Sequence, residues 1–132
     1  MNRWMAGTAG IVVMFAAGAI AWAAAAPATI QTEGLSIGLA TTPNPPARHE
    51  GTAFEISIRD AAGEPLAGAR VSLDLIMPAH PMPENRPRVQ ERSAGRYAAA
   101  GTFGMGGEWF AAVEVVLADG RRARAEFSLR VR

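Results

Sequence analysis

Apolar and polar residues alternate with a period of two along most of the chain after residue 34. Seven short segments show this alternation, the fourth of them weakly: 35–41, 52–59, 70–77, 88–91, 96–103, 108–117 and 122–132. Because successive side chains of a strand point to opposite faces, each segment predicts a strand with one apolar face. No segment after residue 34 has the sustained 3.6-residue period of a helix.

Turn-forming residues separate these segments, and Asp119-Gly120 is a strong two-residue hairpin signal. Seven strands in just under 100 residues predict an all-β fold, an immunoglobulin-like antiparallel β-sandwich over residues 35–132. Trp109 falls on the apolar face of its strand and is expected in the core. Tyr97 lies in a stretch that resembles a tyrosine corner, with the ring inside and the hydroxyl on nearby backbone.

The amino-terminal quarter of the chain has a different pattern, an apolar run over residues 4–26. Its 23 residues are enough to span a bilayer, which needs about 20. Small residues near Ala25 equally fit signal-peptide cleavage. The expected organisation is therefore residues 1–26 as a transmembrane anchor or a signal peptide, 27–34 as a linker, and 35–132 as the sandwich domain.

Both alternatives export the sandwich. Arg3 is the only charged residue before Glu33, so the positive-inside tendency places an anchored amino terminus in the cytoplasm. The sandwich is then expected on the periplasmic face of the bacterial inner membrane, held there through residues 4–26. A cleaved signal would instead release it into the periplasm.

Composition excludes several functions. The net charge is +1, which gives no electrostatic case for binding nucleic acid. The chain has no cysteine, so neither a disulfide nor a thiolate metal site can form. With two histidines, no cysteine and no nucleophile-elbow pattern, the sequence predicts a protein that is not an enzyme.

Strand direction gathers the remaining histidines and methionines. Since successive strands reverse direction, the connections 42–51, 78–87 and 104–107 are expected at one end of the sandwich, remote from the amino-terminal segment. Every histidine and methionine beyond that segment falls at this end: His49, Met77, His80, Met82 and Met105.

Thioether sulfur is a soft ligand that suits Cu(I), and imidazole serves either copper oxidation state. Methionine needs no deprotonation, and prolines in the loop limit the entropy lost on binding. The candidate copper ligands are Met77, His80, Met82 and Met105, with His49 a weaker candidate. In the alternative interpretation Met77 only fills the core, Met105 forms an apolar tip, and the other residues have no function.

The sequence also resembles the YtkA-like domain family over roughly residues 35–132. The resemblance rests on the stretch 54–77, the loop "MPAHPMP" (77–83), "GRY" (95–97) and "FGMGGEW" (103–109). A similarity extends to FixH-type proteins, membrane-anchored factors linked to assembly of copper-containing cytochrome oxidase. The resemblance implies an immunoglobulin-like sandwich with a link to copper. The family's loop usually has Met-Pro-x-Met followed by His, whereas here His80 precedes Met82.

Two functions remain open. In the first, the exported domain binds a copper ion and assists copper handling or metalloprotein assembly, with a copper-dependent membrane protein or transporter as partner. In the second, it is a metal-free interaction module of an envelope or membrane complex. Phe110 and Val116 point away from the expected core and favour the second function mildly.

Overall fold

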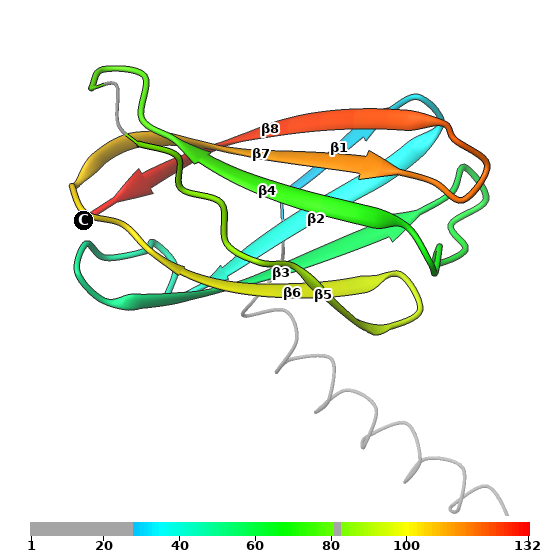
Figure 1. Cartoon of the computed structure of the whole chain (residues 1–132), viewed down its shortest axis with the longest axis horizontal. Helices are drawn as coiled ribbons and strands as arrows, with labels where there is room; N and C mark the ends of the chain where they lie inside the picture. The colour runs from blue at the N-terminus through cyan, green and yellow to red at the C-terminus, as the bar shows by residue number, and fades with distance from the viewer. Residues whose placement is uncertain (1–27, 81–82) are drawn as a thin grey trace, which may run out of the picture.

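The computed structural model describes residues 28–80 and 83–132, which form eight strands (Figure 1). The strands are β1 (Ala28–Thr32), β2 (Leu35–Thr42), β3 (Gly51–Arg59), β4 (Arg70–Ile76), β5 (Gln90–Ser93), β6 (Arg96–Thr102), β7 (Gly107–Val116) and β8 (Arg122–Val131). No helix occurs in these two ranges. The all-β prediction is therefore confirmed for the described residues, with eight strands instead of about seven.

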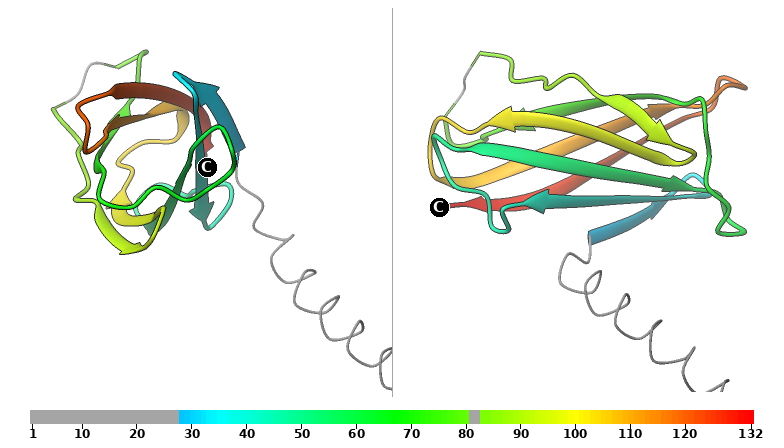
Figure 2. Two further views of the ribbon diagram at one scale, coloured as in Figure 1. Left: turned by 90° about the vertical axis from the view of Figure 1, so that its right-hand side faces the viewer. Right: turned by 90° about the horizontal axis from the view of Figure 1, so that it is seen from below.

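The strands form two antiparallel sheets. Sheet A has the order β1-β2-β3-β6-β5 and sheet B has the order β4-β7-β8. The two layers face each other across one core, as the views in Figure 2 show. β1, at the edge of sheet A, also lies close to β8, at the edge of sheet B.

Inward-facing residues of both sheets make the core, as the alternation predicts. Trp109 is 2% exposed, which confirms its expected core position. Its ring packs edge-on against Phe103 with centroids 5.0 Å apart, and Phe103 meets Phe54 at 6.0 Å. Burying such aromatic side chains is a large part of what stabilises a domain of this size.

β1 occupies most of the segment that was expected to be a linker. It pairs with β2 through a two-residue turn at Glu33 and Gly34, both with positive φ, which is the geometry that suits a tight hairpin. Only Ile30 of this strand packs against the core, and it is partly buried. Because only one of its residues is apolar and faces inward, the sequence of β1 has no alternation of apolar and polar residues from which a strand could be predicted.

The segment 88–91 was expected to form a short strand, and the observed strand β5 starts two residues later. All four residues of β5 are exposed, and its register with β6 is irregular between Glu91 and Ser93. Because both faces of β5 are exposed to solvent, the pattern of apolar residues does not indicate where this strand begins and ends.

The three connections that carry the histidines and methionines lie at one end of the sandwich, on the left in Figure 1. We call it the Met/His end, formed by residues 42–50, 77–80 and 103–106 of the described chain. The carboxyl terminus lies there too: the N–H of Arg132 donates to Pro46 O, and the N–H of Arg48 donates to Arg132 O, both at 2.9 Å. The expected grouping of these connections is confirmed.

The sequence predicted that these connections lie at the end remote from the amino-terminal segment, and the position of β1 corrects this prediction. This strand adds one reversal, and its first residue, Ala28, pairs with Leu39 near the middle of β2. At about 3.3 Å per residue, Leu39 is about 10 Å from the end of β2 at Thr42. The chain therefore joins the sandwich at its side, and the Met/His end is not the remote end.

Tyr97 ties the long β3–β4 connection to the core. Its ring is 2% exposed. Its hydroxyl donates to Leu66 O at 2.9 Å and accepts from the N–H of Ala69 at 3.2 Å. The expected buried ring is confirmed, but the hydroxyl reaches backbone about thirty residues upstream instead of the nearby backbone that a tyrosine corner uses.

Among the residues that the structure describes, none forms a helix of the length and apolar character that a membrane span requires. The expected anchor or signal peptide, residues 1–26, lies outside the described residues.

Candidate functional site

The turn between β6 and β7 is the centre of the Met/His end. Two of its glycines are closely approached by other segments: a Cβ on Gly106 would lie 2.9 Å from a guanidinium nitrogen of Arg48. A Cβ on Gly107 would lie 3.1 Å from the terminal methyl of Met77. The turn is therefore wedged between the 42–50 connection on one side and the end of β4 on the other.

Met77 is buried, with 8% of its surface exposed, and belongs to the core cluster. The alternative interpretation, in which Met77 fills the core, is therefore correct for most of its side chain. Its methyl group reaches the β6–β7 turn at Gly107. The thioether next to that methyl consequently lies at the interior side of the Met/His end.

Met105 has the opposite environment, with 37% of its surface exposed at the tip of the same turn. Its carbonyl oxygen accepts a hydrogen bond of 3.0 Å from Nε1 of Trp109. Since the Trp109 ring is buried against Phe103, this bond fixes the turn to the core. The exposed Met105 side chain is therefore carried on a turn whose backbone is held to the core.

The β4–β5 connection carries the other two candidates. His80 is exposed, and its N–H donates to Met77 O at 3.2 Å, so the chain turns back toward β4. Met82 lies outside the described residues. On the β5 side the connection is held by Asn85, whose carbonyl accepts from Leu75 at 2.9 Å and whose side-chain amide donates to Thr102 O at 3.2 Å.

His49 is closer to the centre than its sequence context suggested. It adopts a left-handed backbone conformation, with φ of 65°, and its N–H donates to Phe103 O at 2.8 Å. This places its backbone at the base of the turn that carries Met105. Nothing in the sequence marks the contact, because it depends on how the 42–50 connection folds back over the end of the sandwich.

The structure thus brings together the backbone of His49, the turn of Met105 and the methyl of Met77, with His80 attached to Met77 through a backbone bond. Within the described residues, no three side chains of His, Cys, Asp or Glu cluster as a metal site would require. The thioether and imidazole side chains present at this end are ligand types that suit a soft ion such as Cu(I).

The two antiparallel sheets place the chain among small all-β sandwich domains. Within that class the chain belongs to the YtkA-like family, whose model matches residues 30–114. The resemblance seen in the sequence is thereby confirmed. No curated protein matches the chain.

Several solved structures share the fold. A copper-bound variant of FetP from uropathogenic Escherichia coli strain F11 superposes with a TM-score of 0.56 at 12% identity, covering 80% of this chain and 90% of that one. A DUF4426 family protein from Pseudomonas aeruginosa gives 0.59 at 10% identity, covering 80% and 94%. A DUF4785 family protein from Legionella pneumophila gives 0.60 at 12% identity over 76% of this chain, which spans only 29% of that protein.

Proposed function

We propose that this chain is an exported, membrane-held copper-binding domain without enzymatic activity. Its site binds one Cu(I) ion through Met77, His80, Met82 and Met105. The observation that carries the proposal is the contact of the Met77 methyl with the turn at Gly107, two residues from the exposed Met105. Two thioethers, one buried and one exposed, thus lie on either side of the same turn.

Chemistry and similarity support this proposal. Thioether and imidazole are suitable ligands for Cu(I), and cysteine is absent from the whole chain. The hydrogen bond from Trp109 to Met105 pre-organises the turn, so less conformational entropy is lost when an ion binds. FetP, one of the structures with the same fold, is a copper-bound protein in the crystal.

The biological role that fits such a site is to hold copper at the periplasmic face of the inner membrane. There the domain would pass the ion to a copper-dependent membrane protein or transporter, or assist assembly of a metalloprotein. Thioether ligands suit transfer, because they release the ion without taking up protons.

A metal-free interaction module is the second candidate function, and an exposed apolar pair favours it. Ile76 on β4 lies directly opposite Phe110 on β7, on the outer face of sheet B. Ile76 is 38% exposed and Phe110 is partly buried. Adjacent apolar side chains on an outer face are suited to contact with another protein.

Competition with a Cu(I)-specific chelator tests the copper proposal. We expect one ion per chain for the wild type and weaker binding for Met105→Leu, Met77→Leu and His80→Ala. Leucine keeps the apolar volume but removes the sulfur, so Met77→Leu should lower affinity with less than about 1.5 kcal/mol of lost stability. Thermal unfolding of the copper-free variants provides the control.

Failure of the wild type to compete with a chelator of micromolar affinity would remove the copper proposal. The interaction module would then be the better account. Substitution of Ile76 and Phe110 by serine should in that case abolish partner binding, and the sulfur-free variants should retain it.

A further inference from the structure

The outer face of sheet A carries a shallow groove that the Met/His chemistry does not use. The groove has a volume of about 630 Å³ and crosses β2, β3, β6 and β5. Its floor consists mainly of small side chains: Ala40, Ala53, Ala98 and Ala100. Two cross-strand rows form it, one through Thr42 and Ala53 and the other through Ala40 and Glu55.

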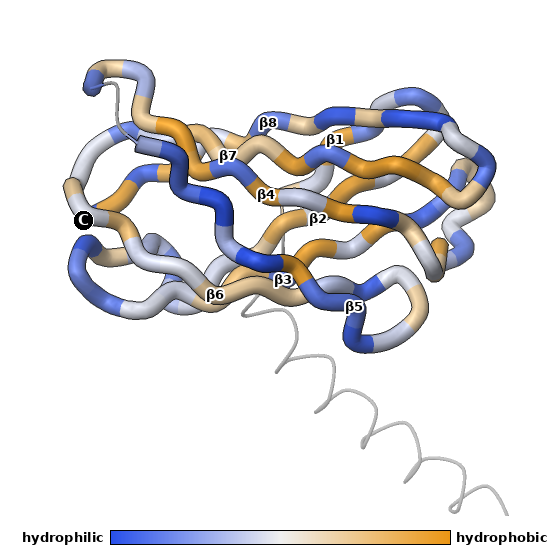
Figure 3. Tube along the Cα trace, viewed as in Figure 1, coloured by the Kyte–Doolittle hydropathy of each residue, from blue (hydrophilic) through white to orange (hydrophobic). Residues whose placement is uncertain are grey.

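The rim of this groove is basic. Arg88 and Arg92 line it on the β5 side, where the chain is strongly hydrophilic (Figure 3). Neither guanidinium group has an ion-pair or hydrogen-bond partner in residues 28–80 and 83–132. The acidic residue in the groove, Glu55, is 3.4 Å from a guanidinium nitrogen of Arg96 and is thereby neutralised.

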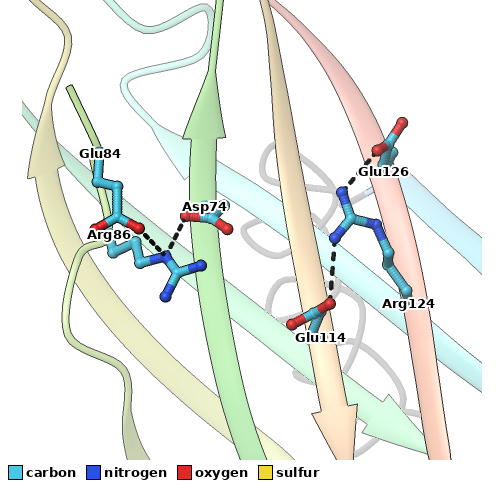
Figure 4. Close-up of polar contacts among 6 residues, drawn as sticks. All are labelled: Asp74, Glu84, Arg86, Glu114, Arg124 and Glu126. Carbon is cyan, nitrogen blue, oxygen red and sulfur yellow. Dashed lines mark hydrogen bonds and ion pairs between the residues drawn. The ribbon is translucent and has the colours of Figure 1, made fainter. Parts of the chain in front are cut away.

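The outer face of sheet B is balanced in charge, because Arg70, Arg122, Arg124 and Arg130 share it with Asp74, Glu108, Glu114 and Glu126. Arg124 lies between Glu114 and Glu126, at 3.2 and 2.8 Å (Figure 4). At the edge of the same sheet, Arg86 is 2.7 Å from Asp74 and also faces Glu84. Arg88 and Arg92 have no acidic counterpart of this kind in the groove, so the outer face of sheet A is the one with excess positive charge and attracts anions.

The position of β1 indicates which anionic surface this is. Ala28 pairs with Leu39, the neighbour of the groove residue Ala40, so the chain joins sheet A beside the groove. Only Pro27 separates Ala28 from the apolar run 4–26. If that run spans the bilayer, the sandwich is held within one or two residues of the lipid headgroups and approaches them from its side.

We propose that the outer face of sheet A rests on the membrane, with anionic phospholipid headgroups bound at the groove by Arg88 and Arg92. Guanidinium groups bind phosphate through paired hydrogen bonds, and a floor of alanines lets the headgroups approach the sheet. The Met/His end is then directed along the membrane surface. This inference rests on the proposed anchoring of residues 4–26, but not on copper binding.

Site-specific labelling of the full-length chain in lipid nanodiscs tests this orientation. Because the chain has no cysteine, Ala100→Cys places a single fluorophore in the groove. Ser72→Cys, exposed on the outer face of sheet B, places one on the other side. The readout is quenching by neutral aqueous acrylamide, in discs of phosphatidylcholine alone or mixed with phosphatidylglycerol.

Acrylamide should quench the label at position 100 less in the phosphatidylglycerol discs than in discs of phosphatidylcholine alone, by a factor of roughly three or more. The reason is that each arginine near an anionic surface shifts partitioning about fivefold. Arg88→Gln with Arg92→Gln should remove that protection, as should about 1 M salt, which shortens the Debye length to about 3 Å. Arg122→Gln with Arg130→Gln, an equal charge change on sheet B, should leave it intact. The label at position 72 should not respond to the lipid.

Two results would overturn the inference and can be told apart. A chain that does not stay with the discs removes the anchoring and, with it, this orientation. A chain that stays with the discs but shows equal quenching in both lipids, or protection that survives loss of Arg88 and Arg92, removes the orientation alone. An acidic segment of a partner protein would then be the better occupant of the groove.

Discussion

Tyr97 shows how a single residue can control the pH range in which this fold is stable. Burial raises the pKa of its phenol above the usual value of 10.0, and the negative charge of Glu91 adds to the shift. The N–H of Ala69 opposes the shift, because it would stabilise the phenolate. The chain has one tyrosine and no lysine or cysteine, so Tyr97 is the only side chain expected to titrate between about pH 9 and 12.

This leads to an expectation for alkaline unfolding. The raised pKa means that the unfolded chain loses the phenol proton first, near pH 10, while the folded chain keeps it. The contribution of Tyr97 to stability is thus complete below pH 10 and is lost as pH rises through the folded pKa, by at most about 1.4 kcal/mol per pH unit. Urea unfolding between pH 7 and 11 measures it.

Tyr97→Phe is the variant that isolates the hydroxyl. It should cost about 1–3 kcal/mol at pH 7, because Leu66 O and the N–H of Ala69 lose their partner. It should also remove the decline above pH 10. A wild-type stability that stays flat to pH 11, or a decline that persists in the variant, would contradict this account.

At the scale of the element, the turn between β5 and β6 is fitted to the β3–β4 connection. Gly95 has a φ of +74°, and its carbonyl accepts the N–H of Ile58 at 2.9 Å. A Cβ at this position would lie 2.6 Å from Cβ of Pro65 and 2.9 Å from Ile58 O. Two connections distant in sequence therefore pack against each other where only glycine fits.

Gly95→Ala should accordingly destabilise the domain by about 3–4 kcal/mol, through left-handed strain together with the clash against backbone. Gly120→Ala is the matched control. Gly120 also has a positive φ, of 92°, but nothing within 4 Å of its Cβ position, so only strain of about 1–2 kcal/mol is expected. Equal losses in urea unfolding of the two variants would show that the packing of Gly95 has no effect.

The elements also show what a sequence can and cannot predict. β3 and β8 were evident because their buried and exposed residues alternate almost without fault. β1 was not evident, since it is held by backbone pairing to β2 and buries little besides Ile30. The grouping of Met77 and Met105 at one end followed from strand direction alone. The contact of His49 with Phe103 could not be predicted in this way, because the path of a connection is determined by tertiary packing.

At the scale of the whole molecule, the sequence leads us to expect Arg3 in the cytoplasm and Arg132 in the periplasm. Alkaline phosphatase, which is active only outside the cytoplasm, should be active when fused after Arg132. Deletion of residues 4–26 should abolish this activity. Activity of a reporter that works only in the cytoplasm would reverse the assignment. The mass of the exported chain would distinguish an anchor, which is retained, from a signal peptide, which is cleaved.

The pairing of Arg132 with Pro46 and Arg48 has a consequence for purification. Any peptide appended to the carboxyl terminus begins at the Met/His end, beside the 42–50 connection and the β6–β7 turn. An oligohistidine affinity tag placed there would supply imidazoles to the same surface and would bind copper itself. Titrations of such a fusion would report the tag, so metal stoichiometry has to be measured on protein whose tag has been removed.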